Sequence, residues 1–127
     1  MLNNSTFRDL RIWQESMDLA EDVDCITSRF PRHEQFGLTS HVRRAAISVP
    51  SNIAEGKGHH TDAEFKRFLF HARGSLLEVQ TQILLACRLQ YITEEKAAAI
   101  CDRIDNVGRG LNALINRFSA RRPTTDN

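Results

Sequence analysis

Side chains that could act as catalytic bases or metal ligands are present in this sequence, but their spacing fits no catalytic or metal-binding motif. The candidate histidines are His33, His41, His59, His60 and His71. They form no pair four residues apart on a helix, and the sequence contains no HExxH or Glu-x-x-His pattern. It also lacks GxGxxG, GxxxxGK[ST] and GxSxG. We therefore predict that the protein is not an enzyme and holds neither a metal nor a cofactor.

A stripe of polar residues is the most distinctive chemical feature of the chain. It follows steps of four, four and three along Arg44, Ser48, Asn52 and Glu55, which places the side chains on one side of a helix. The next helical segment offers a counterpart in Arg67, His71, Ser75, Glu78 and Gln82. If the two stripes face each other, buried charges must pair, for example Arg44 with Glu78 or Glu55. The stripe is a solvated face, a polar network at a helix or subunit interface, or a surface for a ligand or nucleic acid.

Arginine is the preferred cation of this chain, with 14 arginines against 3 lysines. A guanidinium pairs with carboxylates and phosphates in a bidentate manner, so this bias suits protein and RNA interfaces alike. Candidate nucleic-acid contacts near the end of the chain are Arg103, Arg109, Arg117, Arg121 and Arg122. Cations at a helix C-terminus also stabilise the helix itself, which is the alternative explanation for this cluster.

Four amphipathic segments must position these side chains, because apolar residues recur at steps of three and four in each. The segments run from about residue 9 to 29, from 38 to 58, from 61 to 89 and from 93 to 120. Pro31 ends the first segment, and Gly56 and Gly58 end the second with left-handed backbone. Thr61 with Glu64 forms a capping box, and Thr93 caps the last segment.

Short connectors between these helices predict an all-α, up-down-up-down antiparallel four-helix bundle. We expect one domain over residues 1–120 and a disordered polar tail over residues 121–127. Pro50 inside the second helix predicts a bend there. The 127 residues are 41% hydrophobic with a net charge of +1, so the overall charge indicates no particular partner. Three cysteines without a CxxC predict reduced thiols and a cytoplasmic location, and no apolar run is long enough for a membrane span.

The sequence resembles the four-helix bundle family named for open reading frames in intervening sequences of bacterial 23S ribosomal RNA genes. The most specific matches are Phe36-Gly37-Leu38-Thr39, Arg43-Arg44-Ala45-Ala46 and the run from Ser48 to Gly56, with further matches at Trp13, Glu34, Phe65 and Gly74-Ser75-Leu76. His41 stands where the family pattern has glutamine. The resemblance covers roughly residues 7–91. It implies a ring-like homopentamer without established enzymatic activity, with shared polar positions at Arg44, Ser48, Asn52, Glu55, Ser75 and Glu78.

Three functions agree with these observations. The first is a non-enzymatic oligomeric scaffold, because Trp13, Met17 and Ala20 lie beside the main apolar stripe and suggest a subunit interface. The second is an accessory protein that binds RNA, a ribonucleoprotein or a reverse transcriptase, as the similar accessory proteins of diversity-generating retroelements do. The third is a helical bundle that binds a small molecule between helices near Asn52 and Glu78.

Overall fold

The structure is a computed structural model that describes residues 6–120. Within these residues it contains four α-helices, two short 3-10 helices and no strand. The α-helices are α1 (Arg11–Thr27), α2 (Leu38–Lys57), α3 (Asp62–Arg88) and α4 (Glu94–Ala120), and the 3-10 helices are η1 (Phe7–Asp9) and η2 (Arg32–Glu34). The predicted tail at 121–127 lies outside the described residues.

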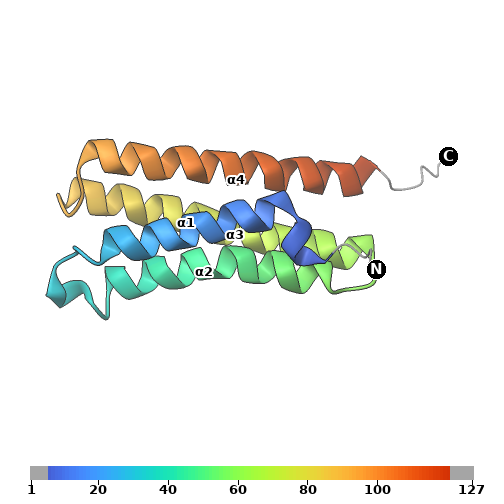
Figure 1. The fold of residues 1–127 in the computed structure, drawn as a ribbon, viewed down its shortest axis with the longest axis horizontal. Helices are drawn as coiled ribbons and strands as arrows, with labels where there is room; N and C mark the ends of the chain where they lie inside the picture. Colours follow the sequence, from blue (N-terminus) through green and yellow to red (C-terminus); the bar gives the residue numbers. More distant parts are fainter. Residues whose placement is uncertain (1–5, 121–127) are drawn as a thin grey trace.

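The four helices run alternately up and down along one long axis (Figure 1). Each helix packs against the helix before and after it in the chain, and α4 returns to pack against α1. As a result α1 lies diagonally across the bundle from α3, and α2 lies diagonally across from α4. The predicted antiparallel arrangement is confirmed, because connectors this short can only join neighbouring ends of helices.

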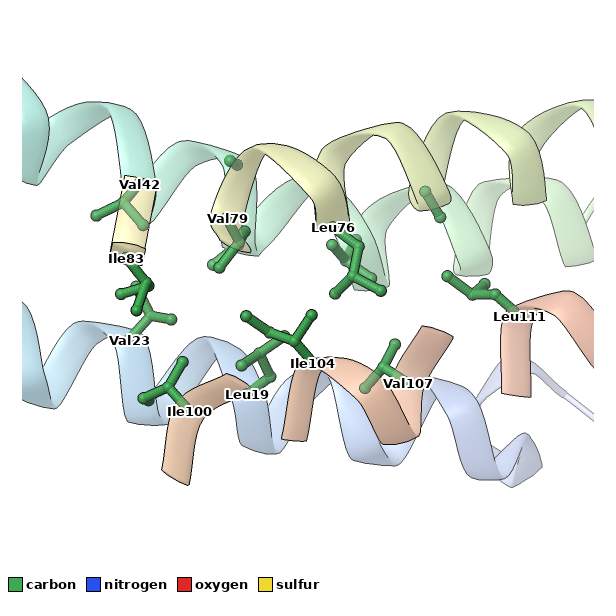
Figure 2. Close-up of a cluster of buried hydrophobic side chains, with 14 of the residues drawn as sticks. Leu19, Val23, Val42, Leu76, Val79, Ile83, Ile100, Ile104, Val107 and Leu111 are labelled. Carbon is green, nitrogen blue, oxygen red and sulfur yellow. The ribbon is translucent and has the colours of Figure 1, made fainter. Parts of the chain in front are cut away.

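One hydrophobic core fills the space between the helices. Figure 2 shows Leu19 and Val23 from α1, with Val42 from α2, pointing towards side chains of α3 and α4. The remaining labelled residues of this cluster are Leu76, Val79, Ile83, Ile100, Ile104, Val107 and Leu111, and all ten are buried. The apolar periodicity of the sequence therefore identified the core-facing side of every helix correctly.

The first helix begins later than the sequence predicts. Thr6 and Asp9 form a capping box around η1, and Leu10 then adopts an extended conformation (φ −76°, ψ 126°). This local capping separates residues 7–9 from α1, so the predicted start near residue 9 was wrong by two residues. The other predicted caps are present in part: Thr61 Oγ1 accepts a hydrogen bond from the Glu64 amide at 3.1 Å, and Thr93 Oγ1 accepts one from the Lys96 amide at 3.1 Å.

Gly56 has a different structural role from the one predicted. No glycine among residues 6–120 has a positive φ, so the expected left-handed backbone at the end of α2 is wrong. Gly56 is buried where α2 crosses α3, and a Cβ atom there would lie 2.6 Å from Phe68 Cβ. Glycine is required for close helix packing at this position. α2 also continues as a helix through Pro50, and a bend there remains a prediction.

Candidate functional site

Half of the predicted polar stripe forms a hydrogen-bonded cluster between α2 and α3. The Oγ atoms of Ser48 and Ser75 lie 2.8 Å apart, and either hydroxyl can donate. The Asn52 amide donates to the Ser48 carbonyl at 2.8 Å and to Ser48 Oγ at 3.0 Å. We name these three half-buried residues the serine seam. The bond between Ser48 and Ser75 links α2 to α3. Asn52, on α2, donates to Ser48 and holds its hydroxyl in place for that bond.

The charged half of the stripe stays at the surface. Arg44, Glu55 and Glu78 are exposed, and none of them forms an ion pair within residues 6–120. The expected pairing of Arg44 with Glu78 or Glu55 is therefore wrong for the single subunit. The small core residues Ala45 and Val49 bring α2 close to α3, so the longer charged side chains beside them extend outwards into solvent.

An open polar cleft lies beside the serine seam. It has a volume of about 480 Å³ and is lined by His41, Arg44, Ala45, Ser48, Glu78 and Gln82. Gln82 Oε1 is buried in the subunit and has no hydrogen-bond partner within the described part of the chain. A buried acceptor without a donor carries a free-energy penalty of about 1–3 kcal/mol, which a water, a ligand or a neighbouring subunit can remove.

The arginines of α4 do not form one patch. Arg103 Nε lies 2.5 Å from Asp22 Oδ2 and its Nη1 lies 3.9 Å from Asp18 Oδ2, so this side chain faces α1. Arg109 hydrogen-bonds to Asn106 on its own helix and lines a groove beside α3. Arg117 stacks over the Phe118 ring. The other two candidates, Arg121 and Arg122, lie outside the described residues.

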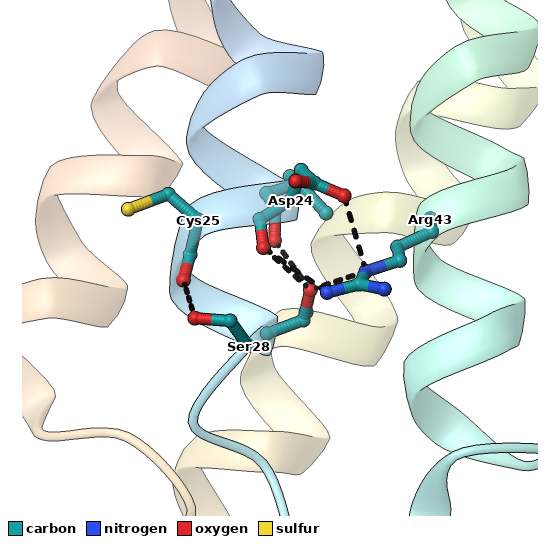
Figure 3. A network of polar contacts seen from close by, with 6 residues as sticks. Asp24, Cys25, Ser28 and Arg43 are labelled. Atoms are coloured by element: carbon teal, nitrogen blue, oxygen red, sulfur yellow. Dashed lines mark hydrogen bonds and ion pairs between the residues drawn. The ribbon is translucent and has the colours of Figure 1, made fainter.

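Arg43 forms a tertiary contact that the sequence analysis missed. Figure 3 shows this side chain extending from α2 to the end of α1. Its Nε donates to Thr27 Oγ1 at 2.8 Å and lies 3.4 Å from Asp24 Oδ1, while Nη2 donates to the Asp24 carbonyl at 3.2 Å. Thr27 is buried and its hydroxyl donates to the Val23 carbonyl at 2.7 Å. The only sequence signal was the Arg43-Arg44 pair in the family resemblance.

Glu34 joins three segments at one end of the bundle. Its Oε1 accepts a hydrogen bond from the Leu38 amide at 3.0 Å, and its Oε2 accepts one from the Tyr91 hydroxyl at 2.8 Å. The Leu38 amide, followed by the Tyr91 hydroxyl, lowers the pKa of Glu34 below its ordinary value. The hydrogen bond from the Tyr91 hydroxyl to Glu34 also raises the pKa of Tyr91. Glu34 thereby caps α2 from outside the helix and ties it to the α3–α4 connector.

Two surfaces that run along helices expose apolar side chains, besides exposed apolar residues elsewhere such as Phe36 and Leu89. The α1–α2 groove has a volume of about 570 Å³ and is lined by Trp13, Met17, Ala20, Glu21, Asp24, Arg43, Ile47, Pro50, Ser51 and Ala54. The second surface, which we name the α3 stripe, comprises Phe70, Gly74, Leu77, Thr81 and Leu84. Its three large side chains are 44%, 58% and 47% exposed in sequence order. Surfaces of this kind mark contact sites for other molecules.

Residues 6–120 contain neither a metal-binding cluster nor a membrane-spanning helix. No three histidine, cysteine, aspartate or glutamate side chains in residues 6–120 are placed to hold a metal ion. No helix in the same range combines the length and hydropathy needed to cross a bilayer. Cys25 is exposed, Cys87 and Cys101 are half-buried, and all three are free thiols. Burial raises the pKa of Cys101 above its ordinary value, which disfavours its thiolate.

The fold places the protein in the class of antiparallel four-helix bundles. A solved structure from Bacteroides thetaiotaomicron, described as a protein with unknown function from the S23 ribosomal protein family, is similar to it, with a TM-score of 0.74 and 20% sequence identity. The match covers 82% of this chain and 97% of that chain. The family model of the 23S rRNA-intervening sequence protein matches residues 8–113, and the chain belongs to that family. No curated protein matches the chain.

Proposed function

We propose that this protein is a non-enzymatic scaffold that assembles with copies of itself into a ring-like homopentamer. The observation that carries the proposal is the pair of exposed apolar surfaces, the α1–α2 groove and the α3 stripe. Leu77 and Ile47 are each 58% exposed in the single subunit, and burial in an interface would remove this apolar surface from water. The family resemblance supports a ring of five copies.

The absolute mass of the purified protein in solution tests the scaffold. Multi-angle light scattering after size-exclusion chromatography is expected to give five times the 14.5 kDa mass of the chain. The absorbance ratio at 260 and 280 nm, recorded on the same peak, detects nucleic acid that co-purifies. A monomer that persists at high protein concentration would refute self-assembly.

RNA binding is the second candidate function. Arg29, Arg88 and Lys96 line one open pocket of about 630 Å³ at the end of the bundle where α3 meets α4. Three cations around one pocket suit a polyanion, although Glu94 on the same rim reduces the local positive potential. We expect binding of structured RNA to weaken steeply with salt and to weaken further in Arg88→Ala. Absence of any salt-dependent shift at low ionic strength would exclude this function.

Small-molecule binding is the third candidate, and the polar cleft at Arg44 and Glu78 favours it. The cleft supplies both charge signs and the unpaired acceptor Gln82 Oε1. A polar ligand that donates to Gln82 would raise the melting temperature of the protein, because it binds only the folded state. Glu78→Gln should reduce that rise. A broad ligand screen that never moves the melting temperature would argue against this function.

A further inference from the structure

The α3 stripe has the spacing of a helix that packs against other helices. Phe70, Leu77 and Leu84 are seven residues apart, with Gly74 and Thr81 at the intervening positions. This alternation of four and three keeps one seam on one side of the helix over about 21 Å. A Cβ atom added at Gly74 would meet nothing within 4 Å. The stripe therefore has open space between Phe70 and Leu77 into which a partner's side chain can fit.

The α1–α2 groove has the shape that would receive such a helix. Trp13 to Asp24 on α1, and Arg43 to Ala54 on α2, line it for about 17 Å along each helix. Ala20, Ser51 and Ala54 are small, so a third helix can approach the two backbones closely. The groove is apolar like the α3 stripe and spans most, though not all, of the length of the stripe.

The charges that flank the two surfaces are complementary. Lys66, Arg73 and Arg88 lie within one turn of residues in the α3 stripe, against one carboxylate, Glu78, beside Leu77. Arg67 is also within one turn but is paired with Glu64. The groove carries Glu21, Asp24 and Arg43 on its rim. Arg43 is paired with Asp24, so the net charge of the rim is that of Glu21. Helix α1 as a whole has five carboxylates and one arginine, although Asp18 and Asp22 are ion-paired with Arg103 of α4. A basic stripe that enters an acidic groove gains favourable electrostatic interactions.

These two surfaces cannot meet within one subunit, because α1 and α3 lie diagonally across the bundle. A symmetric pairing of two α3 stripes would bring like cations together, and a pairing of two grooves would bring carboxylates together. We propose that the α3 stripe of one copy docks into the α1–α2 groove of the next copy. Each subunit then docks its α3 stripe into one neighbour and holds the stripe of the other neighbour in its own groove. This is a heterologous contact, the kind from which rings are built. This inference rests on the proposed scaffold function.

The test uses two variants that each block one surface of the full-length protein. Leu77→Glu places a carboxylate on the α3 stripe, and Ile47→Glu places one in the groove. Both positions are 58% exposed, so neither change should prevent folding, which circular dichroism and thermal melting verify. Ala98→Glu, at an exposed position of α4 outside both surfaces, is the charge-matched control and should assemble as the wild type does.

Each blocked variant alone is expected to have the mass of one chain in light scattering. An equimolar mixture should give a species of two chains, because Ile47→Glu keeps an intact stripe and Leu77→Glu keeps an intact groove. One contact forms, and the mutated surfaces stop further growth. The Ala98→Glu control keeps both surfaces intact and should, measured alone at the same concentration, have the mass of the wild-type assembly.

Other results would overturn the inference. If the groove variant still assembles while the stripe variant does not, the stripes pair symmetrically. If the mixture contains only single chains at about 0.5 mM protein, the Kd between the two surfaces is weaker than about 0.5 mM and the proposed contact is wrong. If both variants assemble like the wild type, another surface carries the assembly and the scaffold function survives. A monomeric wild type refutes the scaffold function itself, before either variant is needed.

Discussion

Gly56→Ala tests the close crossing of α2 and α3. The added methyl carbon would lie 2.6 Å from Phe68 Cβ and 3.0 Å from Phe65 Cδ1. Phe68 Cβ is fixed directly to the α3 backbone, so rotation of the ring cannot relieve the clash and the helices must move apart. Overpacking of this kind costs up to about 3 kcal/mol, and the better helix propensity of alanine offsets about 1 kcal/mol of it.

The expected net effect of Gly56→Ala is a loss of about 2 kcal/mol in the free energy of unfolding, or roughly 6 to 10 °C in melting temperature. Urea denaturation and thermal melting, both followed by circular dichroism at one protein concentration, measure it. Gly58→Ala is the matched control, because its Cβ would lie no closer than 3.5 Å to another atom, and it should change stability by less than about 0.5 kcal/mol. A Gly56→Ala protein as stable as the wild type would refute the packing argument.

Three further substitutions test the polar contacts. Ser48→Ala removes the hydroxyl that lies 2.8 Å from Ser75 Oγ and should cost about 1–2 kcal/mol in urea denaturation; no loss would show that the seam does not stabilise the fold. Arg44→Ala should cost less than about 1 kcal/mol in the same assay, because the side chain is exposed; a loss of several kcal/mol would show that the charge is buried after all. The lowered pKa of Glu34 predicts that its stabilising effect is present above the ordinary value of 4.5 and is lost as the pH falls through the folded-state pKa. Glu34→Gln should remove this pH dependence from the unfolding midpoint, and identical pH profiles for the two proteins would contradict the assignment.

The helices and the core followed from the sequence because they depend on local periodicity. Leu19, Val42, Val79 and Leu111 recur on stripes that only a helix can align, and all four are fully buried or nearly so. The Thr93 cap was predictable for the same reason, since the capping side chain and its amide partner are three residues apart. Short connectors then left few ways to arrange the four helices.

Contacts between helices were harder to predict from the sequence. The polar stripe was identified as one feature, but tertiary packing divides it into a seam at Ser48 and Ser75 and a solvent-exposed part at Arg44. Arg103 was predicted as a nucleic-acid contact, and the sequence did not indicate that it also pairs with Asp22. In both cases the residue types were visible, whereas the partner came from another helix.

The sequence by itself determined the number of helices, their buried sides and most of their ends, because these depend on interactions within about one turn. Only the tertiary structure decided which side chains of one helix contact another helix. It therefore decided that Gly56 is needed for close packing and that Arg43 forms hydrogen bonds with α1. It also decided that the α3 stripe and the α1–α2 groove stay uncovered on different sides of the subunit. Exposure depends on how the helices pack, because an apolar residue in a helical stripe is buried only where another helix covers it.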